Sequence, residues 1–184
     1  MSFEVEFSRD EIQALLTELG RRLLSRHVTG RIYVAGGAAI ALEFPERRVT
    51  RDIGAVFGPA EAVREEAAAI AAEWGLPPTW LSDSVRAFLP PADDPDAKTY
   101  SIPGLEVSVA SPRYLLAMKM APGRPSDLHD LILIFRELGI TQAEQAADIA
   151  QEVYGEESVL VPPRDELILY AQAVLNRIER PPPP

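Results

Sequence analysis

The stretch VAGGAAIALEFPERRVTRDIGAVF, residues 34–57, decides the fold of this chain. It opens on apolar residues, and Gly36 and Gly37 then turn the chain into an Ala-rich segment that favours a helix. It closes on a second apolar run, which is typical of a buried strand. The predicted order is therefore a strand over 31–35, the glycine pair, a helix over 38–42 and a strand over 53–57.

Start and stop signals for helices flank this stretch on both sides. Ser8 and Glu11 form a capping box ahead of apolar positions at helical spacing, which predicts an N-terminal helix. Ser111 followed by Pro112 marks another helix start. The other predicted elements are a helix over 60–74, strands over 85–89 and 105–110, helices over 113–120, 126–138 and 164–179, and a helix that Thr141 and Glu144 cap and that ends at Tyr154.

This order of elements predicts an α/β (α+β) fold, in which a mixed sheet with flanking helices is followed by a C-terminal helical half. We expect residues 1–110 to form the sheet-bearing core and residues 111–184 to form the helical region, together as one compact unit. The chain has 184 residues, of which 47% are apolar and 25% are charged, as is usual for soluble globular proteins.

Composition excludes several classes of function. The chain has no cysteine, which excludes disulfides, thiolate metal sites and cysteine nucleophiles. Its net charge of −10 argues against a protein that coats nucleic acid through a basic surface. The sequence shows neither a secretory signal nor an apolar run of the ~20 residues that a membrane helix needs, so we expect a cytoplasmic protein without a membrane partner.

Five residues of the stretch quoted first indicate a candidate site for a phosphate group and Mg²⁺. A carboxylate such as Asp52 can hold Mg²⁺ against phosphate oxygens while an arginine neutralises charge. A glycine pair lets helix N–H groups approach an anion, although such a pair is also found in ordinary tight turns. The candidate residues are Gly36, Gly37, Arg48, Thr50 and Asp52.

The stretch resembles the nucleotidyltransferases of the polymerase-β superfamily, and in particular the AbiEii and MenT type of toxin from toxin–antitoxin systems. Their pattern places Gly-Gly a dozen or so residues before Arg-x-Thr-x-Asp-x-Asp. This chain matches the pattern up to Asp52 and has Gly54 where the family has its second aspartate. The resemblance implies that the two aspartates hold two metal ions. Gly54 therefore either marks a degenerate member of low activity or replaces an aspartate of the natural protein.

A second match lies in VSVASPRYLLAMKMAPGRPSDLHDL, residues 107–131. The resemblance implies that Lys119 and Arg124 bind nucleotide phosphates and that Asp127 belongs to the catalytic centre. The residues alone also allow a solvated Lys119 and an Asp127 that only complements a helix N-terminus.

Two further acids are candidates with weaker support. Asp130 lies three residues after Asp127, on the same helix face, where the pair can serve function or face water. Glu106 lies on the polar face of its predicted strand, where the superfamily often carries a third carboxylate. Glu106 is therefore a candidate metal ligand beside Asp52.

The resemblance implies a toxin-type, metal-dependent nucleotidyltransferase that transfers nucleotides from an NTP to an RNA 3′ end, with the tRNA acceptor as the expected RNA. Asp52 would hold Mg²⁺ or Mn²⁺, and a cognate antitoxin protein would silence the enzyme. Two alternatives stay open. One is a catalytically inactive binding protein with the nucleotidyltransferase fold, and the other is a small-molecule nucleotidyltransferase of aminoglycoside type.

Overall fold

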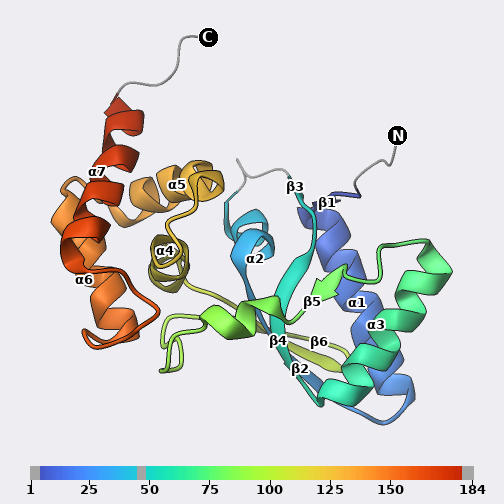
Figure 1. The fold of residues 1–184 in the computed structure, drawn as a ribbon. Coiled ribbons are helices and arrows are strands. Elements are labelled where there is room, and N and C mark those ends of the chain that lie inside the picture. The colour runs from blue at the N-terminus through green and yellow to red at the C-terminus, as the bar shows by residue number, and fades with distance from the viewer. Residues whose placement is uncertain (1–4, 45–48, 180–184) are drawn as a thin grey trace. The chain divides into compact units, whose positions relative to one another are not determined.

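The computed structural model describes residues 5–44 and 49–179 (Figure 1) and has the predicted mixed α/β fold. Arg48, one of the predicted nucleotide-binding residues, lies outside the described residues. The chain divides into two compact units, each with its own internal packing. Unit 1 comprises Met1–Ala87 and Asp96–Ala110, and unit 2 comprises Phe88–Pro95 and Ser111–Pro184.

Unit 1 is built on a five-stranded mixed sheet. In their order across the sheet, the strands are β5 (Leu81–Ser82), β4 (Ile53–Gly58), β2 (Gly30–Ala35), β7 (Leu105–Val109) and β6 (Lys98–Ile102). β2 pairs antiparallel with β4 and parallel with β7, while β5 runs parallel to β4 and β6 antiparallel to β7. A second, two-stranded sheet joins β1 (Phe7–Ser8) to β3 (Val49–Thr50).

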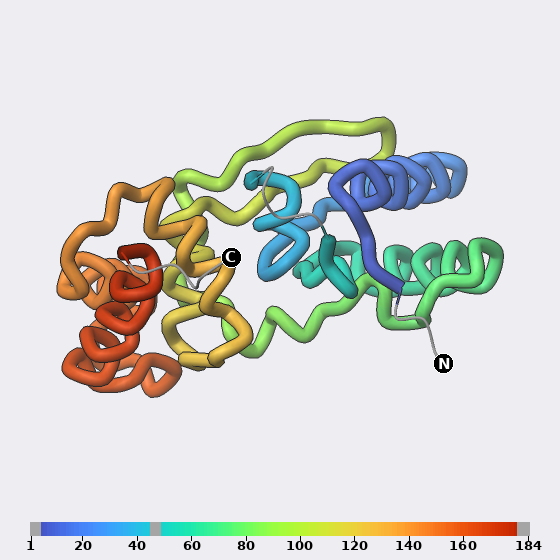
Figure 2. The backbone as a smooth tube through the Cα atoms, turned by 90° about the horizontal axis from the view of Figure 1, so that it is seen from above, coloured from blue at the N-terminus to red at the C-terminus, as the bar shows by residue number. Residues whose placement is uncertain are grey.

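Helices cover one face of the five-stranded sheet. The helices of unit 1 are α1 (Arg9–Ser25), α2 (Gly36–Glu43) and α3 (Ala60–Trp74). α1 and α3 lie side by side, and α1 packs on β7 while α3 packs on β4 (Figures 1 and 2). The strands alternate accordingly, since Ile32 and Val107 are buried whereas Arg31 and Glu106, on the opposite face, are exposed.

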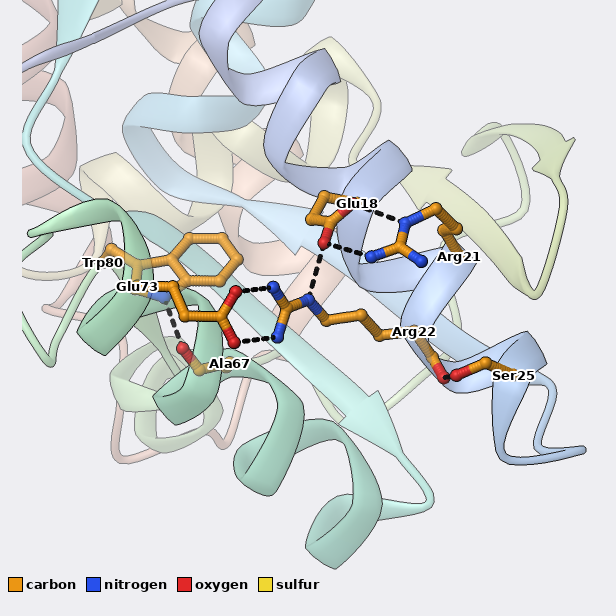
Figure 3. Close-up of polar contacts among 7 residues, drawn as sticks. All are labelled: Glu18, Arg21, Arg22, Ser25, Ala67, Glu73 and Trp80. Atoms are coloured by element: carbon orange, nitrogen blue, oxygen red, sulfur yellow. Dashed lines mark hydrogen bonds and ion pairs between the residues drawn. The ribbon is translucent and has the colours of Figure 1, made fainter.

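A network of ion pairs joins α1 to α3 (Figure 3). Arg22 of α1 donates through two nitrogens to Glu73 of α3, at 3.0 and 2.5 Å, and through Nε to Glu18 at 2.6 Å. The indole N–H of the fully buried Trp80 donates to the carbonyl of Ala67 at 2.9 Å. These contacts connect the two helices that cover the sheet and attach α3 to the loop before β5.

Unit 2 is helical where the structure describes it. Its elements are α4 (Pro112–Met120), the 3-10 turn η2 (Pro125–Asp127), α5 (Leu128–Leu138), α6 (Ala143–Tyr154) and α7 (Arg164–Glu179). α6 packs against α4 and α7, and α5 packs against the same two helices. Residues 88–95 join this unit through Asp94, which accepts hydrogen bonds from the N–H and hydroxyl of Ser111 at 2.7 and 2.9 Å.

The predicted strand over 85–89 is wrong. This segment forms a 3-10 turn, η1 (Ser84–Phe88), that contributes no buried residue, and the strand of this region is the short β5 before it. β6 has no counterpart among the predicted strands, because its exposed residues show no alternation of apolar and polar side chains.

Helix ends follow the predicted signals with two exceptions, of which one is α5, which begins at Leu128 after η2 and not at residue 126. The predicted capping box opens α1, and the Ser111 hydroxyl accepts from the backbone at the start of α4. α6 begins at Ala143, one residue later than a Thr141 cap predicts. Its capping box is therefore formed by Gln142 and Gln145 and not by Thr141 and Glu144. Within residues 5–44 and 49–179, no helix has the length and apolar character that crossing a membrane demands.

We expect the ion-pair network of Figure 3 to weaken at low pH. Hydrogen bonds from Arg21 and then Arg22 lower the pKa of Glu18 from 4.5 to about 2. A carboxylate with a lowered folded-state pKa stabilises the fold above its unfolded pKa, and this stabilisation is lost as pH falls toward the folded value. Urea titrations should therefore show a lower free energy of unfolding for Glu18→Gln near neutral pH. The difference from the parent should shrink between pH 4.5 and about 2. A difference that does not change over this range contradicts the network.

Candidate functional site

The predicted glycine turn lies where β2 passes into α2. Gly36 has a φ of +63°, a left-handed conformation that glycine adopts without strain. The N-cap residue Ala35 makes no side-chain hydrogen bond to the helix, so no side chain at the cap satisfies the first N–H groups of α2. A helix start of this kind favours an anion.

Asp52 lies at the same end of the sheet as this turn. β2 and β4 are antiparallel, and Ala35, the last residue of β2, is opposite Gly54 near the start of β4. The start of α2, which follows Ala35, and Asp52, which precedes β4, therefore lie at the same edge of the sheet. The buried Thr50 donates its hydroxyl to the carbonyl of Asp52 at 3.1 Å, which positions the backbone of the acid. The structure therefore brings Gly36, Gly37, Thr50 and Asp52 to one corner of unit 1, hereafter the Asp52 corner.

The Asp52 carboxylate is half-buried, and burial raises its pKa above the ordinary value. Among the described residues, no cationic side chain forms an ion pair with it. Half-burying a charge without a compensating partner disfavours the charged form, so this carboxylate is one that a bound cation would stabilise.

Gly54 is buried, and the space beside it is filled by Val85 of η1. A β-carbon at position 54 would lie 2.7 Å from Cγ1 of Val85, and one at Gly36 would lie 3.8 Å from the same methyl group. A side chain at position 54 therefore needs Val85 to move. The sequence did not predict the role of Val85, because its segment was assigned to a strand. No local pattern predicts a contact between positions 54 and 85, which are far apart in the chain.

Glu106 lies away from the Asp52 corner. Arg31 of β2 is opposite both Gly58 and Glu106, so Glu106 is level with Gly58 rather than with Gly54. Asp52 lies two residues beyond Gly54, so six residues of strand, roughly 20 Å, separate the levels of Asp52 and Glu106. Glu106 instead approaches Arg31 at 3.5 Å and helps to line a shallow groove of about 560 Å³ on the open face of the sheet.

This position corrects the prediction of Glu106 as a metal ligand beside Asp52. Metal–oxygen bonds are about 2.0–2.6 Å long, so one ion cannot contact both carboxylates at that separation. The described residues contain no group of three or more His, Asp or Glu side chains arranged to hold a metal ion. Asp52 fits the way in which Mg²⁺ is often held, by one or two carboxylates together with substrate phosphates. A pair of carboxylates at positions 52 and 54 does not fit, because Gly54 has no side chain.

Unit 2 contains a buried cluster of one lysine and two aspartates, hereafter the Lys119 cluster. Nζ of Lys119, on α4, lies 2.6 Å from Oδ1 of Asp127 and 2.8 Å from Oδ2 of Asp130, on η2 and α5. Lys119 is 8% exposed and Asp130 is 2% exposed. The structure therefore brings together three of the predicted site residues, and a solvated Lys119 is excluded.

Asp127 also differs from a simple helix-capping acid. It is the N-cap residue of α5, but its side chain makes no capping hydrogen bond and receives the Lys119 ammonium instead. Two carboxylates share one ammonium in the Lys119 cluster, so the acids outnumber the lysine two to one. The cluster links α4, η2 and α5, which makes it part of the packing of unit 2.

Arg124 stacks on an aromatic ring in the same unit. Its guanidinium carbon lies 5.3 Å from the ring centroid of Phe88, and its carbonyl accepts the hydroxyl of Tyr170 at 2.8 Å. The carbonyl of Phe88 in turn accepts a hydrogen bond from the hydroxyl of Tyr154. Phe88 is 36% exposed, so this arginine and aromatic pair lies at the surface of unit 2.

The two clusters differ in how their charges are compensated. Among the described residues, the Asp52 carboxylate has no ion pair, whereas the Lys119 cluster supplies its own counter-ion. The chain matches no protein-family model, no curated protein and no solved structure. Its function is therefore argued from the chemistry of these two clusters.

Removing Lys119 should lower the free energy of unfolding by about 3–5 kcal/mol, because the change removes the ammonium that both acids contact. We expect urea unfolding of Lys119→Ala to show this loss, and Asp130→Asn in the Lys119→Ala background to recover part of it. Arg113→Ala is the matched control, since Arg113 pairs with Glu152 on the surface and such pairs contribute about 0–1 kcal/mol. A loss for Lys119→Ala no larger than that of the control contradicts a structural role for the cluster.

Proposed function

We propose that the chain binds an NTP at the Asp52 corner and transfers its nucleotide to an RNA 3′ end, with the tRNA acceptor as the expected RNA. The proposal rests on one observation. Asp52 is half-buried beside a helix start, and burial raises its pKa. Keeping such a charge lowers stability, and groups of this kind are typical of functional sites. The resemblance of the surrounding residues to nucleotidyltransferase toxins supplies the class of reaction.

Each residue of the corner has a role in this proposal. The N–H groups at the start of α2 receive phosphate oxygens, and Gly36 and Gly37 allow the phosphates to approach the backbone. Thr50 holds the backbone of Asp52 through its hydrogen bond to the carbonyl. Mg²⁺ or Mn²⁺, held by Asp52 and the phosphates, would neutralise charge at the α-phosphate when bound. A cytoplasmic location and silencing by a cognate antitoxin protein belong to the same proposal.

The roles of Lys119, Arg124 and Asp127 in phosphate binding and catalysis are also proposed from the resemblance. Lys119 can turn toward a phosphate only by giving up an ion pair. The side chain of Asp127 is 16% exposed against 3% for that of Asp130, so the pair with Asp127 is the one that solvent can replace at lower cost.

A second candidate function is nucleotide binding without transfer. The observation that favours it is Gly54, whose missing carboxylate leaves one acid where the resembling enzymes use two. Because each metal-supported charge interaction contributes several kcal/mol to a transition state, a chain with one carboxylate loses much of its rate. Binding does not carry the same requirement, since Mg²⁺ is often held through phosphates and a single carboxylate.

Asp52→Asn should abolish Mg²⁺-dependent NTP binding without lowering stability. A raised pKa means that the folded chain favours the protonated carboxyl, so the ionised group destabilises the fold once pH exceeds the folded pKa. Near neutral pH the variant should therefore unfold at the same temperature as the parent or higher. Adding Mg²⁺ and ATP should raise the unfolding temperature of the parent but not that of Asp52→Asn.

Asp148→Asn is the matched control for this comparison. Asp148 pairs with Arg164 on the surface of unit 2 at 2.7 Å, so its replacement should leave the shift by Mg²⁺ and ATP intact. An Asp52→Asn variant that loses stability, or that still responds to Mg²⁺ and ATP, identifies Asp52 as a structural residue and contradicts the proposal.

Transfer is tested with four labelled NTPs, Mg²⁺, and either total tRNA or an aminoglycoside as acceptor. We expect label to enter RNA. The variant Gly54→Asp with Val85→Ala restores the carboxylate and the room for it, so the parent should transfer label on the order of 100-fold more slowly than this variant. Label in the aminoglycoside identifies the small-molecule alternative. Binding without label in either acceptor, for both proteins, identifies the non-catalytic alternative.

A further inference from the structure

The segment that follows β5 places one methyl group over Gly36 of the Asp52 corner and over the neighbouring Gly54. Cγ1 of Val85 is the nearest atom to the missing side chains of Gly36 and Gly54, at 3.8 and 2.7 Å from their would-be β-carbons. The first distance is ordinary van der Waals contact, and the second leaves no room for an added carbon. Val85 thus fills the volume beside the start of α2 and β4.

We propose that η1 is a plug for this corner, and that Val85 is the residue that decides whether a nucleotide phosphate reaches it. The plug rests on the proposed function, because it assumes that the Asp52 corner receives a nucleotide. With Val85 in place, its side chain occupies the space above Gly36 and Gly54. Access therefore requires Val85 to withdraw, and nucleotide and Val85 compete for one position.

The plug also accounts for Gly54. Val85 is β-branched, so its χ1 is restricted and its methyl groups cannot swing aside as the end of a longer side chain would. Any residue with a β-carbon at position 54 then meets Cγ1 at 2.7 Å and displaces the segment. Glycine at position 54 and valine at position 85 are therefore a complementary pair, and an aspartate at position 54 alone is not enough to rebuild a two-carboxylate site.

Residues 84–87 of η1 can move at low cost, because the contacts with Arg124 and Tyr154 fall on Phe88 alone. η1 buries none of its residues, and short 3-10 turns have weaker hydrogen-bond geometry than α-helices. The N–H of Arg86 donates to the carbonyl of Asp83 at 3.0 Å, and the N–H of Ser84 donates to Oγ of Ser82 at 3.2 Å. The ion pair of Asp83 with Arg64 is exposed on both sides. Segments with few buried contacts open at the low end of the free-energy range of a protein.

The structural half of the proposal is tested by a double-mutant cycle that needs no nucleotide. Urea unfolding is measured for Gly54→Ala, Val85→Ala and the double variant. We expect Gly54→Ala to lower the unfolding midpoint in the parent and to have a much smaller effect when Val85 is already alanine. Gly58→Ala, on the same strand, is the matched control, because a β-carbon there meets nothing within 4 Å. Equal effects of Gly54→Ala in both backgrounds overturn the plug.

The functional half is tested by ATP binding with Mg²⁺, measured by calorimetry. Val85→Ala should bind ATP about five- to tenfold more tightly than the parent, because moving η1 away from Gly36 and Gly54 then breaks fewer contacts of the residue 85 side chain. Val56→Ala, the same change on β4, should leave the affinity unchanged. The Val85 side chain is partly exposed, so its truncation leaves the fold intact. Equal affinities for the parent and Val85→Ala overturn the plug while leaving the proposed function standing.

Hydrogen exchange gives the direct readout of the movement. Saturating ATP and Mg²⁺ should speed exchange at the N–H of Arg86, whose bond to Asp83 belongs to the closed turn, and should slow exchange at the first residues of α2. Slowing at both places shows a nucleotide bound beneath a closed segment and overturns the plug. Coupling in the cycle without ATP binding to any variant overturns the proposed function, and the plug's role with it.

Discussion

The candidate chemistry of this chain depends on one register, the antiparallel pairing of β2 with β4 that sets Ala35 opposite Gly54. A slip of one residue would turn every side chain of β4 to the other face of the sheet. The core prevents such a slip, because Val34 and Ala55 are paired and both are completely buried. Burial of apolar side chains therefore places the glycine turn and Asp52 at the same corner, although none of the core residues takes part in the chemistry.

Asp52 and the ion pairs of α1 and α3 make opposite contributions to stability within unit 1. The carboxylate of Glu18 has two arginine partners that favour its charged form, whereas burial disfavours the charged form of Asp52. A protein that keeps a poorly compensated charge must offset it elsewhere, and the network between the two covering helices is one such offset. Ionised Glu18 therefore stabilises the fold, whereas ionised Asp52 destabilises it.

Local signals in the sequence predicted much of this fold. α3 and α7 have the predicted bounds, since glycine and proline mark their ends, and the strand, glycine turn, helix and strand of the opening stretch are present. Local signals could not predict the level of Glu106 on the sheet, because register depends on which strands are neighbours. They could not predict the place of Val85 either, because a contact between η1 and β4 arises only after the sheet has formed.

The same limit applied to the Lys119 cluster, but there the sequence spacing was informative. Asp127 and Asp130 are three residues apart at a helix start, and Lys119 lies in the last turn of the preceding helix, so a short connection brings the three together. What spacing could not show was burial, and burial changes the role of the lysine. Two carboxylates already hold this ammonium, so in the proposed role of Lys119 a phosphate would replace Asp127 rather than add to it. Asp130, with a side chain that is 3% exposed, would then hold Lys119 in position, and an anion bound there would displace one acid.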